Sequence, residues 1–131
     1  MLIVKGEVEM QIYIDQKDKS KVAIVESSEI EISDVQGALD LMASIKYTDG
    51  CDKIMINKSN ITEEFFDLRT KLAGEILQKY MNYNVIIAIV GDFEGYDSKS
   101  LKDFIYECNK GKRVFFLKDK QAALHALHSI D

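Results

Sequence analysis

Proline is absent from the 131 residues of this chain, and neither a low-complexity segment nor a shift in composition marks a linker between domains. No apolar run is long enough to cross a membrane. The N-terminal MLIV stops at Lys5 and lacks the apolar core and cleavage site of a signal peptide. The sequence therefore predicts a single cytoplasmic domain over residues 1–131 that does not associate with a membrane.

The chain has only two cysteines, and its acidic residues outnumber its basic ones. Cys51 and Cys108 show no C-x-x-C spacing, which is typical of reduced thiols that pack as small hydrophobic side chains. The formal net charge of -5 repels phosphate backbones, and the basic residues are scattered along the chain. We therefore expect no disulfide and no nucleic-acid partner.

The usual signatures of catalysis and cofactor binding are also missing. Gly91 and Gly95 form neither a dinucleotide-binding loop nor a P-loop, and the chain contains no G-x-S-x-G. His125 and His128 stand three residues apart with no third metal ligand nearby in sequence, so we expect both on a solvated helix face. We predict no metal, no cofactor and, on balance, no enzymatic activity.

What is present is a regular alternation of hydrophobic patterns. Period-two or fully apolar runs predict strands over residues 10–16, 21–27, 53–57, 84–93 and 113–119. Helical spacing predicts helices over residues 33–50, 62–80, 101–111 and 120–130. Ser33 and Gln36 form the predicted capping box of the first helix.

This β-β-α-β-α-β-α-β-α order predicts an α/β fold with four parallel strands preceded by an antiparallel edge strand. Ligand sites in open parallel sheets lie at the carboxyl ends of the strands. Polar residues expected near that end are Asn57, Ser59, Asn60, Asp92, Ser98, Lys99 and Ser100. The Ser98-Lys99-Ser100 hydroxyls and cation could hold a small anion, and the alternative is that Asp97, Ser98 or Ser100 only caps the helix.

Arg69 is the residue that fits its predicted surroundings least. On a helix over residues 62–80 it falls within the apolar stripe that contains Phe65, Leu72 and Ile76. A guanidinium in such a place must be paired, bind an anion or reach water. We predict a structural ion pair with Asp92 or Asp34, and the alternative is a ligand-binding arginine.

Five segments carry a family resemblance: DVQGALDLMA, GCDKI, FFDLRTKLAGEILQKYMNY, AIVGDFEGYDSKSLKDFIYECNKG and VFFLKDKQAALHAL. In this order and spacing they resemble the bacterial domain-of-unknown-function family 4180, over roughly residues 9–128. The resemblance implies a fold and carries no established activity. Residues 1–8 lie outside it and are interpreted as a possible N-terminal extension.

A more distant similarity links the element order to STAS domains of the anti-sigma-factor-antagonist type. It implies strands in sequential order, and the alternative is the doubly wound order of a flavodoxin-like sheet. The phosphorylated Asp-Ser-Ser/Thr-Gly turn of STAS antagonists is absent. Ser59 and Thr62 are the nearest hydroxyls, but a phosphate there would face Glu63 and Glu64, which argues against a phosphorylation switch.

Two functions follow as hypotheses. The first is a non-catalytic protein-interaction or regulatory module, and the second is a small-anion binder or small enzyme at the strand ends. Convergence of Arg69, Asp92 and Lys99 would favour the second. Tyr80, Met81 and Tyr83 extend the apolar surface of the second helix and predict a weak preference for a homodimer.

Overall fold

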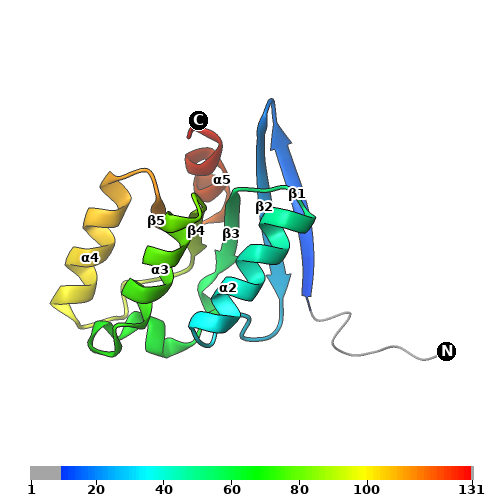
Figure 1. The fold of residues 1–131 in the computed structure, drawn as a ribbon. Coiled ribbons are helices and arrows are strands. Elements are labelled where there is room, and N and C mark those ends of the chain that lie inside the picture. Colours follow the sequence, from blue (N-terminus) through cyan, green and yellow to red (C-terminus); the bar gives the residue numbers. More distant parts are fainter. Residues whose placement is uncertain (1–9, 131) are drawn as a thin grey trace.

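The computed structural model describes residues 10–130, which form one α/β domain (Figure 1). The strands are β1 (Met10–Lys17), β2 (Ser20–Ser27), β3 (Lys53–Asn57), β4 (Ile86–Val90) and β5 (Val114–Leu117). The α-helices are α2 (Val35–Ala43), α3 (Leu72–Asn82), α4 (Lys99–Lys110) and α5 (Lys120–His128). The predicted extension over residues 1–8 lies outside the described residues. No helix within residues 10–130 has the length and apolar character needed to cross a membrane.

The five strands form one sheet in sequential order. β1 pairs antiparallel with β2, and β2 to β5 are parallel, with Met55 of β3 opposite Ile24 of β2 and Ala88 of β4. The predicted fold class and strand order are confirmed. The flavodoxin-like alternative is wrong, because β2 does not lie between β3 and β4.

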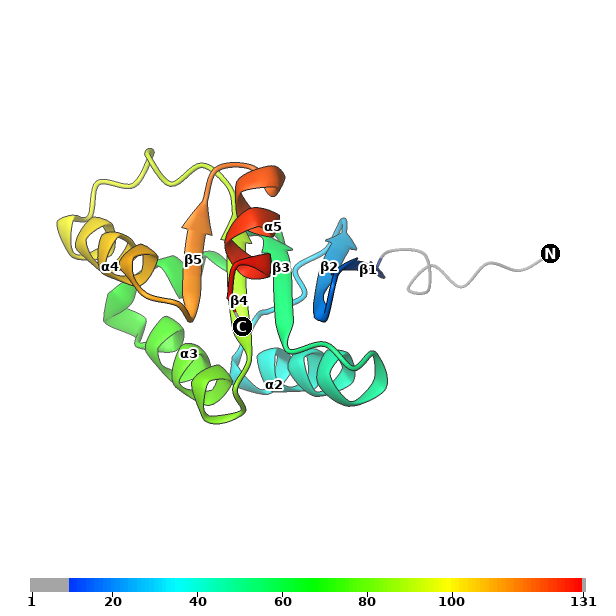
Figure 2. The same ribbon diagram turned by 90° about the horizontal axis from the view of Figure 1, so that it is seen from above.

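The sequential order decides how the helices cover the sheet. Each new parallel strand is added on the same side of the preceding one, so the right-handed crossovers place α2, α3 and α4 on the same face of the sheet. α5 lies alone on the other face (Figure 2). Alternate residues of each strand therefore enter two cores, so that Ile87 packs under the three helices and Ala88 under α5. All four parallel strands end at the lower side of the molecule in Figure 1, called here the carboxyl end.

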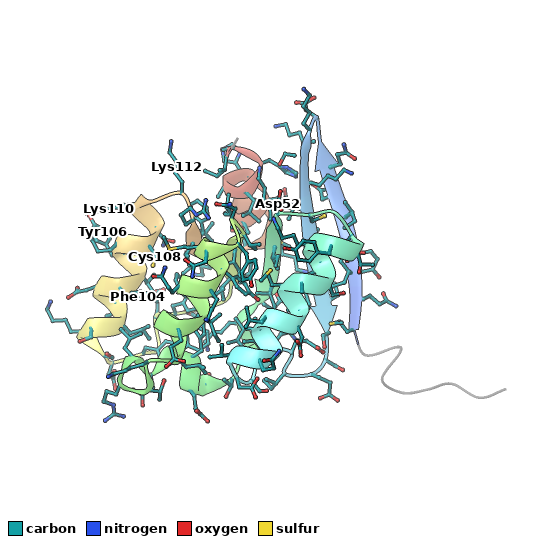
Figure 3. The ribbon with its side chains drawn as sticks, viewed as in Figure 1. Asp52, Phe104, Tyr106, Cys108, Lys110 and Lys112 are labelled. Carbon is teal, nitrogen blue, oxygen red and sulfur yellow. The ribbon has the colours of Figure 1, made fainter. Side chains whose placement is uncertain are left out.

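α4 covers the β5 side of the three-helix face. Leu101 is buried there, and Phe104 and Cys108 are half-buried against the same core (Figure 3). Cys51 and Cys108 are both free, and burial raises the pKa of each thiol, which agrees with the predicted inert packing role. On the exposed side of α4 the Lys110 ammonium lies 4.4 Å from the Tyr106 ring centroid.

α2 begins one residue later than its predicted capping box implied. Asp34 is the N-cap, and its Oδ1 accepts a hydrogen bond of 2.7 Å from the Gly37 amide. Ser33 therefore does not cap the helix. α2 continues into a π-helical turn, Ser44–Thr48, and the chain leaves it through Gly50 at a φ of 70°.

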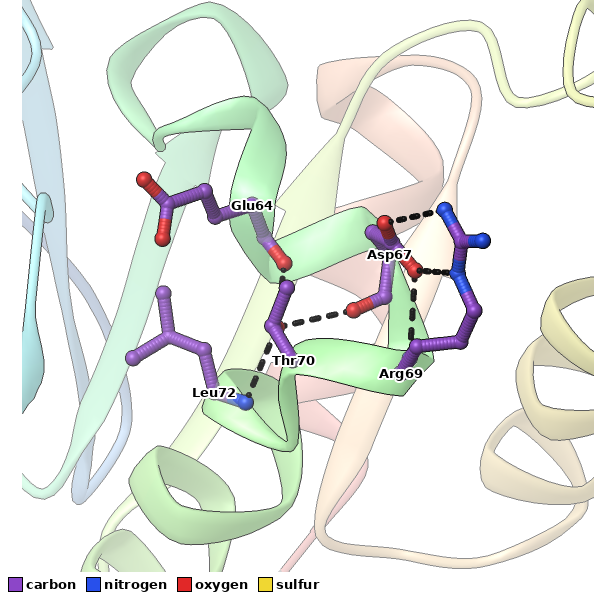
Figure 4. Close-up of polar contacts among 5 residues, drawn as sticks. All are labelled: Glu64, Asp67, Arg69, Thr70 and Leu72. Carbon is purple, nitrogen blue, oxygen red and sulfur yellow. Dashed lines mark hydrogen bonds and ion pairs between the residues drawn. The ribbon is translucent and has the colours of Figure 1, made fainter.

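The predicted helix over residues 62–80 is wrong in its first half. Residues Glu63–Phe66 and Leu68–Thr70 form two 3-10 turns, and α3 begins only after Lys71, whose φ is 67°. Thr70 Oγ1 lies 2.8 Å from the carbonyl oxygens of both Glu64 and Asp67 and accepts the Leu72 amide at 3.2 Å (Figure 4). These local side-chain contacts replace the helical hydrogen bonds that the apolar spacing alone predicted.

Tyr80 ties α3 to α2 in the interior. It is 1% exposed, and its hydroxyl donates a 2.7 Å hydrogen bond to the Ala38 carbonyl, so it does not belong to the surface proposed for self-association. Met81 and Tyr83 do remain exposed. A homodimer through them stays a prediction, which light scattering tests.

We expect Tyr80→Phe to lower the free energy of unfolding by about 1 kcal/mol at neutral pH, because the hydrogen bond to Ala38 is lost. Burial raises the pKa of the Tyr80 hydroxyl above its ordinary value near 10. The unfolded chain therefore releases this proton first, and the stability that the hydroxyl contributes is present below about pH 10 and is lost as the pH rises further. Urea unfolding between pH 7 and pH 11 should show a smaller alkaline loss for the variant, and equal losses would contradict this.

Candidate functional site

Two cavities open at the carboxyl end of the sheet. The first, called here the β3–β4 cavity, has a volume of about 430 Å³. It brings together predicted site residues from two strand ends, Asn57 and Ser59 after β3 and Asp92 after β4. Its remaining lining residues are Ile30, Lys58, Ile61, Glu63, Val90 and Gly91.

Gly91 is required where β4 ends because the chain after β3 passes directly over it. A Cβ at this position would lie 2.6 Å from Lys58 Cβ and 3.1 Å from Lys58 Cδ. The absent side chain lets the Lys58 stem lie across the strand end. The Lys58 ammonium then reaches 4.9 Å from the Tyr96 ring centroid and 5.9 Å from that of Phe66.

The second cavity, called here the Arg69 cavity, has a volume of about 690 Å³ and shares Glu63 with the first. It lies between the 3-10 turns that follow β3 and the loop that leads into α4. Its lining residues are Glu63, Phe66, Asp67, Leu68, Arg69, Tyr96, Asp97, Ser98 and Ser100.

Tyr96 and Glu63 join the walls of the two cavities. The Tyr96 hydroxyl donates to the Glu63 carboxylate, with oxygens 3.0 Å apart, and Lys58 Nζ lies 3.9 Å from the same carboxylate. Burial, and then this hydrogen bond, raise the pKa of Tyr96, which therefore stays a protonated donor. The Tyr96 ring stacks on Phe66 with centroids 5.6 Å apart.

Arg69 is exposed, and its predicted burial is wrong. Its side chain is 91% exposed, and its partner is Asp67 rather than Asp92 or Asp34. Arg69 Nε and one terminal nitrogen each donate a 2.9 Å hydrogen bond to Asp67, whose Oδ1 also accepts the Arg69 amide (Figure 4). These donated hydrogen bonds lower the pKa of Asp67. The guanidinium is thereby held at the mouth of the Arg69 cavity.

A comparison with protein-family models matches residues 17–127 to the model described as Domain of unknown function (DUF4180). The chain belongs to this family. The matched part of the DUF4180 domain runs from the last residue of β1 to α5 and includes the lining residues of both cavities. No curated protein matches the sequence.

The remaining site residues predicted for this DUF4180 domain do not converge on one point. Ser98 is the N-cap of α4, and its Oγ accepts the Leu101 amide at 3.1 Å. Lys99 is 88% exposed and pairs with Asp103 at 2.7 Å, one turn further along α4. Asp92 accepts the Glu94 amide. Arg69, Asp92 and Lys99 thus lie in different surroundings, and a ligand-binding role for any of them stays a prediction.

Asn60 lies in the interior rather than in either cavity. It is 1% exposed, and its Nδ2 donates hydrogen bonds to the carbonyls of Ser27 and Glu29 at 2.9 and 2.7 Å. The main-chain carbonyl of Asn60 accepts the amides of Glu31 and Ile32. Asn60 therefore positions the connection between β2 and α2, which borders the β3–β4 cavity.

The sequence prediction did not name Glu63, Phe66 or Tyr96 as site residues, and it expected Lys58 at the carboxyl end of the sheet without giving it a role. Glu63 looked like a first-turn acid of a long helix, and Phe66 carried no functional signal of its own. Tyr96, an aromatic residue inside a glycine-containing polar loop, was the one available hint.

Of the two histidines expected on a solvated face, only His125 is exposed. The His128 side chain is 7% exposed and lies between Ser20 and Asp15, so the prediction for it is wrong. In the described part of the chain, no group of three or more His, Cys, Asp or Glu side chains is placed to hold a metal ion.

Exchanging Arg69 for methionine tests the exposed placement. We expect no measurable change in the free energy of unfolding, because exposed pairs contribute little to stability. Chemical denaturation measures it, with Lys99→Met as the control for another exposed paired cation. A large loss of stability in the Arg69 variant alone would instead indicate a buried, structurally essential pair.

Proposed function

We propose that this DUF4180 domain is a non-catalytic protein-interaction module of STAS-like type that works in the cytoplasm, and that its carboxyl end binds a basic segment of a partner protein. The topology supports the STAS-like part of the proposal. The sheet has the sequential strand order that this resemblance implies, with three helices on one face.

The charge around the Arg69 cavity is the observation that carries the proposal. Glu63, Asp67 and Asp97 contribute three carboxylates to its lining, against the single cation of Arg69. That cation is already engaged with Asp67, and the Glu63 side chain is 73% exposed. Glu63 lies 3.9 Å from Lys58 and Asp67 is paired with Arg69, so within the described residues Asp97 is the lining carboxylate that forms no ion pair. This excess negative charge attracts a lysine or arginine from a partner and repels an anion.

The aromatic wall supplies the second feature of the surface. Phe66 and Tyr96 stack at the boundary between the two cavities, and the Lys58 ammonium already lies over both rings. A partner arginine or lysine that displaces the Lys58 ammonium can pack its stem on this wall and place its charge near Glu63. The alternative, a small-anion binder or enzyme at the same end, is not favoured because Arg69, Asp92 and Lys99 do not converge.

A titration of the full chain with synthetic peptides tests this function. The peptides have equal length and carry zero to four Lys or Arg residues, and amide NMR shifts report binding. We expect saturable shifts in residues 63–69 and 91–98 that grow with peptide charge and weaken with added salt. Glu63→Gln combined with Asp97→Asn should weaken binding about tenfold.

Glu107→Gln combined with Asp103→Asn on α4 is the matched control, because both acids lie outside the two cavities and pair with lysines of α4. It should bind the peptides as the original chain does. Shifts that map elsewhere, or an equal response from this control and from the variant of Glu63 and Asp97, would show that this surface does not bind basic segments.

A further inference from the structure

A third cavity, larger than the two at the carboxyl end, lies at the opposite end of the sheet, where the parallel strands begin. This amino-end cavity has a volume of about 1100 Å³ and extends from the β1–β2 turn to the C-terminal turn of α5. Figure 3 shows Asp52, one of its lining residues, at the upper end of the molecule. The lining residues are Lys17, Asp18, Lys19, Ser20, Lys21, Gly50, Asp52, Lys53, Asn84, Ile86, Arg113, His128, Ser129 and Ile130.

The lining is strongly cationic although the whole chain is acidic. Three lysines come from the β1–β2 hairpin, Lys53 from the start of β3 and Arg113 from the residue before β5. The lining acids are Asp18 and Asp52, and Asp52 is already paired with Lys46 at 2.6 Å. Within residues 10–130 the three hairpin lysines and Arg113 form no ion pair.

Helix dipoles do not account for the hairpin lysines. Lysines in the last turns of helices, such as Lys110 of α4, offset the negative helix ends at this end of the molecule. Arg113 acts in the same way, because its guanidinium donates a hydrogen bond of 3.4 Å to the Met81 carbonyl in the last turn of α3. Lys17, Lys19 and Lys21 belong to a β-hairpin, which has little net dipole, so their position around the cavity needs another explanation.

A buried polar network forms one wall of the cavity. Lys53 is 7% exposed, and its ammonium donates to Ser20 Oγ at 2.8 Å and to the Ile130 carbonyl. Ser20 Oγ lies 2.7 Å from His128 Nδ1, and His128 Nε2 lies 2.7 Å from Asp15 Oδ2. The network holds the end of α5 against the hairpin and thereby fixes this wall of the cavity.

We propose that the amino-end cavity binds a small multivalent anion bearing phosphate groups. Lys19, Lys21 and Arg113 supply donors for the phosphate oxygens, and Lys17 adds positive charge to the same lining. This site is separate from the acidic surface at the carboxyl end.

The test titrates the full chain with inorganic phosphate, pyrophosphate and tripolyphosphate, against sodium chloride at matched ionic strength. Melting temperature and amide NMR shifts are the readouts. We expect affinity to rise with the number of phosphate groups, and shifts to appear at residues 17–21, 53 and 113. Lys21→Gln and Arg113→Gln should each weaken tripolyphosphate binding about tenfold.

Lys99→Gln and Lys102→Gln on α4 are controls of equal charge change, because neither residue lines the cavity. Both should bind as the original chain does. A response no larger than that to sodium chloride, or equal losses in all four variants, would overturn the site. Binding to phosphatidylglycerol vesicles without binding to any soluble phosphate would also overturn it, because it would assign the cations to a lipid surface.

Discussion

Replacing Asn60 by alanine is expected to lower the free energy of unfolding by about 2–3 kcal/mol. The side chain is 1% exposed and gives one hydrogen bond each to the carbonyls of Ser27 and Glu29. Alanine leaves both carbonyls without this donor in a partly buried place. The connection between β2 and α2 then loses its attachment to the segment after β3.

Asn57→Ala is the matched control, because Asn57 is half-buried in the same stretch and its side chain forms no hydrogen bond within the described residues. It should cost less than about 0.5 kcal/mol. Asn60→Asp should lower the free energy of unfolding more than Asn60→Ala does, because a carboxylate would face the two carbonyls without a proton to donate. Urea unfolding followed by circular dichroism ranks the three variants, and equal costs for Asn57→Ala and Asn60→Ala would refute this role.

Replacing Gly91 by alanine is expected to cost about 1–3 kcal/mol. The new Cβ would lie 2.6 Å from Lys58 Cβ. A contact between two Cβ atoms cannot be relieved by rotating a side chain, so the backbone after β3 must move away from the end of β4. That movement would also withdraw the Lys58 ammonium from the Tyr96 ring, which should change the near-ultraviolet circular dichroism of the tyrosines.

Gly74→Ala is expected to have the opposite effect on the free energy of unfolding. Gly74 lies inside α3, and a Cβ there would meet no atom within 4 Å. Alanine should stabilise the chain by about 0.5–1 kcal/mol, because it reduces the freedom of the unfolded state. If Gly91→Ala proved as stable as Gly74→Ala, the close approach of Lys58 to β4 would not constrain the fold.

The strands and their order could be predicted because their signals are local and strong. The apolar centre of β3 and the fully apolar run of β4 are typical of central parallel strands, and alternation with helices leaves few possible topologies. The helix predicted over residues 62–80 failed where short-range polar contacts compete with apolar spacing. Asp67 binds the Arg69 side chain and amide, and Thr70 contacts two carbonyls, so the backbone forms 3-10 turns before α3.

The sequence predicted at which end of the sheet a site would lie, but it predicted only some of the residues that line the cavities there. The carboxyl end of the sheet does carry two cavities, and Asn57, Ser59, Asp92, Ser98 and Ser100 line them. Arg69 was predicted on the apolar face of a helix, but it is exposed because Leu68–Thr70 form a 3-10 turn. Tyr96 and Glu63, which meet across 33 residues of sequence, gave no local sign of their contact.

The fold class, the strands and the net charge of -5 follow from residue identity and spacing along the chain, and so they could be read from the amino-acid sequence. The places where the charges gather depend on the folded chain. Parallel strands start at one end of the sheet and finish at the other, so the hairpin lysines, Lys53 and Arg113 meet at the amino end. Glu63, Asp67 and Asp97 meet at the carboxyl end for the same reason. Contacts such as that of Asp15 with His128 join residues that are 113 positions apart, and no local sequence pattern predicts them.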